Sequence, residues 1–349
     1  MSLKQFVLHA AKLTGLFAVS RRLTRGQLRI LCYHGIWLGG APHYGDCLFM
    51  DKATFSARLE MIKRLGYPVI GLDAAVSGLR DGSLPAAAVV ITIDDAWHGT
   101  FTDMIPALER HGMPATLYVT TYYATHQKPV LNVLIGYMVQ RAESLPSPTH
   151  LFPGEEIDGS AWPLRDRDGY AKALAAYLEA QPTLDSRWEM LESIAPAFGL
   201  DLERLVRDRC FHLMDEDALR ECRHRGTDLQ LHTHSHRMHD FELDAVSREL
   251  RLNREHLSAM LERDCSDLRH FCYPSGVYSE RIFGTLRQSG IVSATTTEFG
   301  LNGRDANVMA LARILDCQSM SEIELEAKLC GFWSLMQSAR RFVSRSSTA

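Results

Sequence analysis

The sequence predicts an α/β fold, a distorted (β/α) barrel of about seven parallel strands that carries a helical insertion. Short apolar runs alternate with amphipathic stretches, which is the pattern of a mostly parallel sheet wrapped by helices. Polar clusters follow directly after several of these runs, and parallel barrels place their active sites at the C-terminal ends of the strands. The chain has 349 residues, of which 46% are hydrophobic and 23% charged, so it can bury a large core.

Eight apolar runs are expected to form strands, and amphipathic segments between them are expected to form helices. The strands are expected at residues 28–33, 68–71, 89–93, 115–120, 228–231, 270–273, 291–296 and 309–314. The helices are expected at residues 54–65, 102–111, 243–263 and 279–289. Asp51 or Thr54 can cap the first helix and Gly66 can end it.

Residues 122–225 break this rhythm, because the stretch is long and is helical in pattern at 170–180 and 187–194. Prolines punctuate it at Pro146, Pro148, Pro153, Pro163 and Pro182. We therefore expect an insertion that either caps a substrate cleft or only elaborates the packing. The expected organisation is an N-terminal amphipathic segment, a barrel with its insertion, and a C-terminal helix with a frayed tail. These parts span residues 1–27, 28–320 with 122–225 inserted, and 321–349.

Composition excludes some classes of protein. The net charge is −4, which argues against a dedicated nucleic-acid surface, so no nucleic-acid partner is expected. Eight cysteines occur without a CxxC pair, which favours reduced, structural thiols over a zinc ribbon. The apolar stretch 6–19 is interrupted by His9 and Lys12 and lacks a small-residue cleavage site, so it is a poor signal peptide and too short to span a bilayer.

Apolar residues between Leu3 and Phe17 recur at helical spacing, and Arg21, Arg22 and Arg25 follow them. Such a helix can lie on an anionic membrane surface, or it can pack against the core of the protein itself. The apolar residues at helical spacing are Leu3, Phe6, Val7, Ala10, Leu13 and Phe17. With no signal peptide expected, we predict a cytoplasmic protein that can be peripheral at the inner membrane.

Four of the fifteen histidines fall in the eight positions 232–239. In an extended strand His232 and His236 would lie about 13 Å apart, too far for one ion with bonds of about 2.1 Å to nitrogen. The chain is therefore expected to bend here, which lets the two imidazoles bind one metal ion. The alternative is a solvated histidine-rich loop.

A second polar cluster is Asp94-Asp95, which directly follows the apolar run 89–93. Two carboxylates at the mouth of a hydrophobic strand need a cation or strong hydrogen bonds. Because adjacent residues point in different directions, one aspartate can bind a metal while the other acts as a general base. The alternative is that the pair caps the helix expected at 102–111.

Two further strand ends carry candidate residues, namely His34 after the first strand and the sequence Tyr273-Pro274-Ser275-Gly276. The coincidence of four polar clusters at strand ends supports a mononuclear metal hydrolase. Its site would contain two histidines and one aspartate as ligands, an aspartate base and a histidine acid.

These residues resemble the motifs of the polysaccharide deacetylases, the NodB-homology group or carbohydrate esterase family four. The family motif TFDDG is similar to Thr92-Ile93-Asp94-Asp95-Ala96, and H-[ST]-x-x-H is matched by His232-Thr233-His234-Ser235-His236. A third motif, built on a Pro-Tyr-Gly turn, is similar to Tyr273-Pro274-Ser275-Gly276. The resemblance covers roughly residues 28–316, and the insertion matches nothing in the minimal barrel of the family.

The resemblance implies that Asp95, His232 and His236 hold one divalent metal ion, zinc in preference to cobalt, nickel or manganese. It also implies that Asp94 is the base, and that a backbone N–H of the third motif, that of Ser275, stabilises the oxyanion. Tyr273 and Pro274 belong to the same oxyanion and substrate region.

The remaining roles depend on departures from the common pattern. Most of the family takes its acid from a late Leu-x-His motif, but no histidine follows His270 here. A circularly permuted branch, which deacetylates poly-N-acetylglucosamine, takes it from a Tyr-His after the first strand, so the resemblance assigns the acid to His34. Ala96 replaces a glycine, and Cys272 stands where an arginine often orients the base. Arg313 is expected to substitute for that arginine, with Arg269 as the alternative.

The expected function is hydrolysis of a non-peptide carbon–nitrogen bond, the removal of acetyl groups from N-acetylated amino sugars. The resemblance implies a polysaccharide or glycolipid precursor as substrate and exopolysaccharide biosynthesis as the setting. Two alternatives stay open. The same chemistry serves an O-acetyl esterase or another amide hydrolase. The second alternative is a catalytically silent barrel that binds carbohydrate.

Overall fold

The computed structural model describes residues 2–154, 162–262, 264 and 266–337. The chain divides into two compact units. The first comprises residues 1–37, 45–125 and 214–349, and the second comprises residues 38–44 and 126–213. The expected C-terminal tail falls outside the described residues from position 338 on.

The first unit is built on a closed barrel of seven parallel strands, which confirms the predicted fold class. Its strands are β1 (Arg29–Tyr33), β4 (Val89–Ile93), β5 (Ala115–Val119), β6 (Asp228–Leu231), β7 (His270–Cys272), β8 (Ser293–Phe299) and β9 (Leu311–Leu315). They are hydrogen-bonded in sequence order, and β1 pairs with β9 to close the barrel. Every residue of β1, β4 and β5 is buried, as expected for strands covered on both faces.

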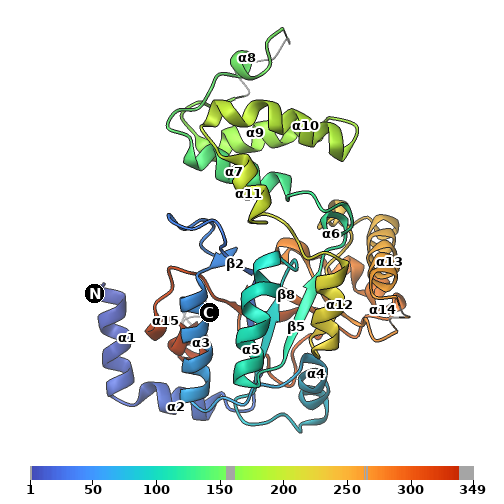
Figure 1. The fold of residues 1–349 in the computed structure, drawn as a ribbon. Helices are drawn as coiled ribbons and strands as arrows, with labels where there is room; N and C mark the ends of the chain where they lie inside the picture. Colours follow the sequence, from blue (N-terminus) through green and yellow to red (C-terminus); the bar gives the residue numbers. More distant parts are fainter. Residues whose placement is uncertain (1, 155–161, 263, 265, 338–349) are drawn as a thin grey trace, which may run out of the picture. The chain divides into compact units, whose positions relative to one another are not determined.

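Helices cover the outside of this barrel (Figure 1). They include α3 (Lys52–Arg64), α4 (Leu72–Asp81), α5 (Ile105–His111), α12 (Glu216–His224), α13 (Leu243–Met260) and α14 (Phe283–Gln288). The helix expected at 102–111 begins with a wider, π-helical turn, η1 (Thr100–Met104), which precedes α5. The helix expected at 279–289 begins with a tighter, 3₁₀ turn, η6 (Glu280–Ile282), which precedes α14. The expected helix 243–263 ends at Met260, and residue 263 lies outside the described residues.

The strand expected at 68–71 is wrong. Only one isolated bridge forms there, between Val69 and Val89. Gly71 then becomes the N-cap of α4, so the chain leaves the barrel after a single pairing. A separate small sheet pairs β2 (Gly35–Ile36) with β3 (Phe49–Met50) immediately after β1.

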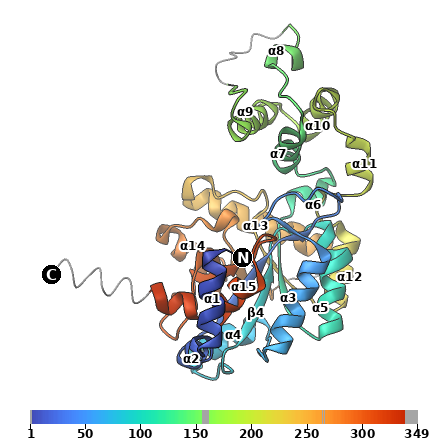
Figure 2. The same cartoon turned by 90° about the vertical axis from the view of Figure 1, so that its left-hand side faces the viewer.

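Two short helices open the chain, α1 (Leu3–Leu13) and α2 (Leu16–Leu23), and Gly15 joins them with a φ of +80°. Leu8, Ala11 and Phe17 pack against Ile323 and Ala327 of α15 (Glu322–Leu329). Figure 2 shows α1 beside α15. Within the described part of the chain, no helix combines the length and the hydropathy that crossing a membrane requires.

The second unit is helical. It contains α7 (Leu131–Arg141), α8 (Pro148–Leu151), α9 (Arg167–Glu179), α10 (Leu184–Ile194) and α11 (Leu202–Arg207), and α6 (Tyr122–His126) leads into it. Leu134, Tyr170, Leu174 and Leu191 are fully buried in this unit, which therefore has a core of its own. Residues 155–161 lie outside the description.

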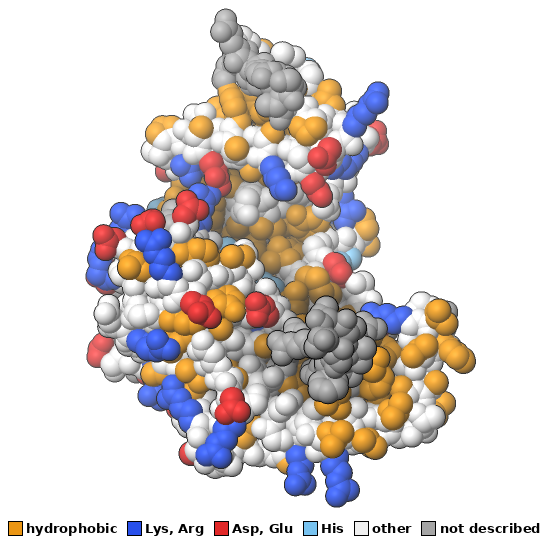
Figure 3. Space-filling model, turned by 180° about the vertical axis from the view of Figure 1, so that it is seen from behind, with side chains coloured by type: hydrophobic (Ala, Val, Ile, Leu, Met, Phe, Trp, Pro, Cys, Tyr) orange, Lys and Arg blue, Asp and Glu red, His pale blue; other side chains and the backbone are white. Residues whose placement is uncertain are grey.

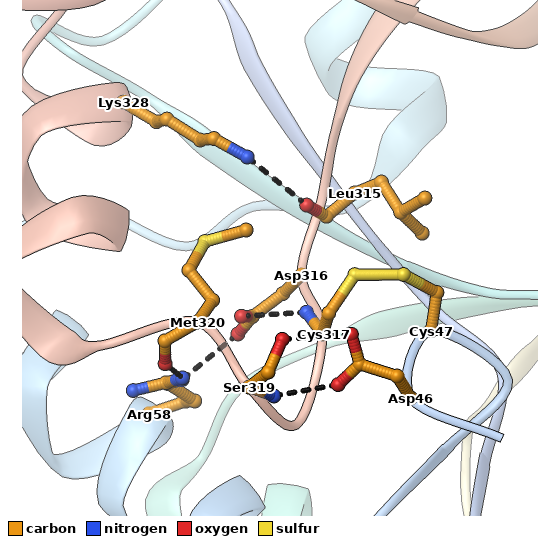
Figure 4. The surroundings of a disulfide bond; sticks show 9 residues. All are labelled: Asp46, Cys47, Arg58, Leu315, Asp316, Cys317, Ser319, Met320 and Lys328. Atoms are coloured by element: carbon orange, nitrogen blue, oxygen red, sulfur yellow. Dashed lines mark hydrogen bonds and ion pairs between the residues drawn. A yellow bond between two sulfur atoms is a disulfide. The ribbon is translucent and has the colours of Figure 1, made fainter.

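A disulfide joins Cys47, in the loop before β3, to Cys317, just after β9 (Figure 4). This corrects the expectation of reduced thiols throughout. The pairing was invisible in the sequence because 270 residues separate the two cysteines, and only barrel closure brings them together. The other cysteines in the described part of the chain, five in number, are free and buried.

Candidate active site

The predicted site residues lie where the barrel strands end. His34 follows β1, Asp94 follows β4, His232 follows β6, and Tyr273 follows β7. After β4 the backbone turns at once, because Asp95 and Ala96 both adopt left-handed conformations, with φ of 72° and 67°. The turn points the two adjacent carboxylates at different partners, as the sequence predicted.

Asp95, His232 and His236 form one cluster of metal-ligating atoms. Oδ1 of Asp95 lies 3.2 Å from Nε2 of His232 and 3.3 Å from Nε2 of His236. Two ligands of a tetrahedral zinc ion, each about 2.05 Å from it, are about 3.3 Å apart. The aspartate oxygen is therefore spaced from each histidine as a shared divalent ion requires, all three donor atoms lie within 4.8 Å of one another, and mixed nitrogen and oxygen donors suit zinc.

His232 is held in the orientation that a ligand needs. Its Nδ1 lies 2.8 Å from the carbonyl oxygen of Cys272, which accepts a hydrogen bond from the Nδ1–H and leaves the Nε2 lone pair facing Asp95. The backbone N–H of His232 donates to Oδ1 of Asn253 on α13. Asn253 also donates to the carbonyl oxygen of Val119, so one buried amide ties β5 to the start of the histidine loop.

The histidine loop bends as predicted. Thr233 and His236 have φ of 64° and 59°, which breaks the extended path after β6 and brings the two ligating imidazoles to a centroid distance of 4.8 Å. Glu249 of α13 fixes the bend by accepting hydrogen bonds from the backbone N–H and the hydroxyl of Ser235. Between the ligands, His234 turns to a different partner, because its Nδ1 lies 2.9 Å from the hydroxyl of Thr121.

Asp94 is buried and paired with Arg313 of β9. The guanidinium donates two hydrogen bonds of 2.7 Å, one to each carboxylate oxygen. Burial alone would raise the pKa of Asp94, but the charge and hydrogen bonds of Arg313 hold that pKa well below its usual range. The carboxylate therefore stays ionised. Arg269, the alternative partner, lies against Asp73 instead, with Nη2 2.7 Å from Oδ1 of that residue.

Arg313 is itself fixed by the barrel. Its Nε donates to the carbonyl oxygen of Thr296, and its Nη1 donates to the hydroxyl of Thr92. Cys272, at the position where the family often has an arginine, lies 3.2 Å from Nη2 of Arg313, and its thiol donates to Asp94 at 3.4 Å. An arginine from another strand thus reaches the carboxylate that Cys272 cannot neutralise.

His34 approaches the same carboxylate from β1. Its Nε2 lies 3.9 Å from Oδ2 of Asp94, and its side chain is 18% exposed, so solvent reaches the imidazole. The carbonyl oxygen of His34 accepts a hydrogen bond from the hydroxyl of Thr100, which helps to fix the backbone at this position. His34, Asp94 and Cys32 also form a second cluster of potential ligand atoms.

The third motif forms a tight turn, η5 (Pro274–Gly276), directly after β7. Ser275 is exposed with a φ of 56°, and Gly276 has a φ of 69°. A Cβ on Gly276 would lie 2.0 Å from Oγ1 of Thr297, so only glycine fits there. Tyr273 and Pro274 are buried, and the Tyr273 hydroxyl donates to the carbonyl oxygen of Met309. The side chain of Tyr273 is thus directed into the core, and its role in the oxyanion and substrate region stays a prediction.

Three residues that support the cluster were not found from the sequence. Trp97 donates from Nε1 to Oδ2 of Asp95 at 2.8 Å, which leaves Oδ1 for the two histidines. Glu249 and Asn253 lie four residues apart on α13, buried beside its apolar residues. Two polar residues inside the apolar stripe of an amphipathic helix were the signal that could have revealed them.

Two other histidines near the motifs, His98 and His234, lie outside the ligand cluster. The ring of His98 lies near that of Phe101, and His234 stacks on His256 with ring centroids 4.5 Å apart. The side chain of His239 lies outside the described part of the structure.

Comparison with known proteins finds a partial match to one family. Residues 81–148 match the sequence model of the polysaccharide deacetylase family, a stretch that contains β4, Asp94 and Asp95. The chain is also 27% identical over 134 residues to the Bacillus subtilis protein YxkH, whose name assigns it to the polysaccharide deacetylases. That alignment covers 38% of this chain and spans less than half, 45%, of the relative. The resemblance predicted from the motifs is confirmed.

Solved structures of deacetylases share the fold. The Streptococcus pyogenes deacetylase PplD, determined with acetate, aligns with a TM-score of 0.57 at 16% identity, over 87% of this chain and 98% of that one. IcaB from Ammonifex degensii aligns with a TM-score of 0.52 at 14% identity, over 87% and 97% of the two chains. At these identities the likeness concerns the fold.

Proposed function

We propose that this protein is a metal-dependent hydrolase that removes acetyl groups from N-acetylated amino sugars in a polysaccharide or glycolipid precursor. The observation that carries the proposal is one arrangement at the strand ends. A three-residue metal cluster, Asp95 with His232 and His236, stands beside a buried ionised carboxylate, Asp94, which Arg313 orients and His34 approaches to 3.9 Å.

The ligand cluster fits one divalent ion, and we propose zinc. Its two donor separations of 3.2 and 3.3 Å match tetrahedral coordination, and three protein ligands leave a position open, as catalytic zinc sites do. When bound, such an ion polarises a carbonyl as a Lewis acid and lowers the pKa of water. Trp97 and the carbonyl oxygen of Cys272 orient two of the three ligands before any ion binds.

The protein groups around the cluster divide the proton transfers between them. Asp94, kept ionised by Arg313, accepts a proton from the attacking water. His34 donates a proton to the amine that leaves, so the carbon–nitrogen bond breaks with a neutral product. The backbone N–H of Ser275, on an exposed turn, donates to the oxyanion that develops on the acetyl carbonyl.

The test is acetate release from N-acetylglucosamine oligomers, a nucleotide sugar and a lipid-linked sugar by the purified protein. A chelator should abolish release and zinc should restore it. Asp94→Asn should lower the rate at least about 100-fold, the usual contribution of a general base. Asp217→Asn makes the same substitution at an exposed site on α12 and should leave the rate of acetate release unchanged.

Each rival function gives a different result. Faster release from O-acetylated than from N-acetylated sugars would assign the site to an esterase. Carbohydrate binding without release from any substrate, with zinc bound, would identify a silent barrel. Release that survives both the chelator and Asp94→Asn would overturn the proposed mechanism.

A further inference from the structure

Exposed apolar side chains concentrate at the start of the chain. Among the described residues, eleven large hydrophobic side chains are exposed, and seven of these lie between positions 3 and 23. We call these seven the N-terminal apolar face; they are Leu3, Phe6, Val7, Leu13, Leu16, Val19 and Leu23. Isolated exposed hydrophobic residues are normal on soluble proteins, but such a cluster marks an interaction surface.

The members of this face on α1 point away from the protein core. Leu3, Phe6, Val7 and Leu13 follow helical spacing along one side, and Leu13 is 88% exposed. Leu8 and Ala11, on the other side of the same helix, pack against α15. The helix is therefore apolar on two faces, and only one of them meets the protein.

Helix α2 continues the pattern. Leu16, Val19 and Leu23 recur at i, i+3 and i+7 and are 47%, 54% and 69% exposed. Phe17 and Ser20 point inward and are buried. In Figure 3 hydrophobic side chains gather over the right-hand lobe, the side on which the two helices lie in that view.

Positive charge accompanies the apolar face. Residues 1–27 contain five Lys or Arg and no acidic residue, and the first acidic residue of the chain is Asp46. The rest of the chain, with 33 basic and 42 acidic residues, has a net charge of −9. Lys4 and Lys12 pair with Glu324 and Glu326 of α15, so the remaining positive charge lies in the last turn of α2 and at Arg25.

The arginines at the end of α2 and just after it supply that charge. Arg21 donates to the carbonyl oxygens of Leu65 and Gly66, which anchors it to the protein, whereas Arg22 and Arg25 are exposed. An apolar helix face flanked by exposed arginines is the composition of helices that lie in the interface of anionic bilayers. A second copy of the chain would instead bring two positive surfaces together.

We propose that the N-terminal apolar face docks on an anionic lipid bilayer, with Arg22 and Arg25 at the headgroups. Docking there leaves the active site free, because α2 leads into β1 at Arg29, the N-terminal end of the barrel, whereas Asp94 and Asp95 follow the C-terminal end of β4. The inference is independent of the proposed activity, since no residue of the face belongs to the candidate active site.

The test is flotation of the full chain with vesicles of phosphatidylcholine alone or with 30% phosphatidylglycerol, about a third anionic lipid. We expect binding to the anionic vesicles only. Phe6→Gln with Leu13→Gln should weaken that binding at least tenfold. The matched control, Leu164→Gln with Leu243→Gln, changes two exposed leucines elsewhere and should bind as the parent does. Thermal unfolding of each variant shows whether it folds.

A second pair of variants tests the charge. Arg22→Glu with Arg25→Glu should weaken binding at least tenfold, whereas Arg110→Glu with Arg304→Glu, two exposed arginines elsewhere, should not. Failure of the parent to bind anionic vesicles would overturn the proposal, as would equal binding to both vesicle types. Light scattering without lipid tests whether the face instead binds a second copy of the chain. If the parent is a dimer and the variant Phe6→Gln with Leu13→Gln is a monomer, the face is a dimer interface and the proposal is overturned.

Discussion

Arg313 and Asp94 are 219 residues apart in the sequence, and two parallel hydrogen bonds of 2.7 Å join their side chains inside the barrel. Both groups are buried, so each charge needs the opposite charge of the other to offset the cost of its removal from water. The pair also decides which oxygen of Asp94 faces His34, because both carboxylate oxygens are oriented by the guanidinium plane.

The first prediction concerns this pair. Arg313→Lys keeps the positive charge but cannot donate two parallel hydrogen bonds, so Asp94 should lose its orientation and part of its ionisation. Because Arg313 lowers the pKa of Asp94, the variant should have a higher pKa there. A base works above its pKa, so the acid limb of the pH–rate profile should move to higher pH, with kcat at least about tenfold lower at neutral pH.

Steady-state rates of acetate release between pH 4 and 9 would check this shift. Arg269→Lys is the control, because Arg269 pairs with the exposed Asp73. A profile for Arg313→Lys that superimposes on that of the parent would show that the arginine does not control the base.

The second prediction concerns the loop that carries the metal-ligating histidines. Glu249 accepts two hydrogen bonds from Ser235, which lies between His232 and His236. Glu249→Gln should weaken zinc binding about 10- to 100-fold, the usual effect of removing a group that orients metal ligands. Glu255→Gln, six residues later on α13 and exposed, should leave the affinity unchanged. Competition with a fluorescent chelator measures both affinities, and equal values would contradict the role of Glu249.

The third prediction concerns the disulfide between Cys47 and Cys317. A cross-link that closes so long a loop is expected to contribute about 2–4 kcal/mol to the free energy of unfolding. Reduction should lower the urea midpoint of the parent protein but not that of Cys47→Ser. Mass spectrometry of peptides from the unreduced protein identifies the bond directly, and a free Cys47 there would contradict it.

This cross-link also bears on where the protein resides. Disulfides persist in oxidising compartments and are rare in the cytosol. The cytoplasmic location predicted from the sequence therefore stays a prediction, and the redox state of Cys47 in protein taken from its source is a direct test of it.

The residues that sequence patterns could locate are those at the ends of apolar strands. Asp94, Asp95, His34 and His232 each follow such a strand, and parallel packing brings strand ends together whatever their separation in the chain. The bend of the histidine loop followed from distance alone, since an extended chain would keep His232 and His236 apart.

What the sequence could not reveal depended on the closed barrel. Arg313 and Arg269 were equivalent candidates until the barrel placed one against Asp94 and the other against Asp73. The motif match likewise could not show that the Tyr273 hydroxyl turns inward to Met309. Side-chain direction at a turn is set by packing, which a motif does not record.

The last prediction concerns the attachment of the N-terminal helices to α15. Glu324 caps α15 through Ser321 and pairs with Lys4 of α1. Hydrogen bonds from Lys4 and Ser321 lower the pKa of Glu324 from 4.5 to about 2. A carboxyl whose folded pKa is depressed stabilises the protein above its unfolded pKa, and this stability is lost as pH falls through the folded value.

Glu324→Gln should therefore lower the free energy of unfolding at pH 7, by about 1 kcal/mol if the loss resembles that of a helix cap. The difference from the parent should shrink between about pH 4.5 and pH 2, where Glu324 becomes protonated. Urea unfolding across this range measures it. Glu322→Gln, at an exposed residue whose only described ion pair is a 3.5 Å contact with Arg64, is the control and should differ little from the parent at any pH. A pH-independent difference for Glu324→Gln would mean that its charge does not hold α1 to α15.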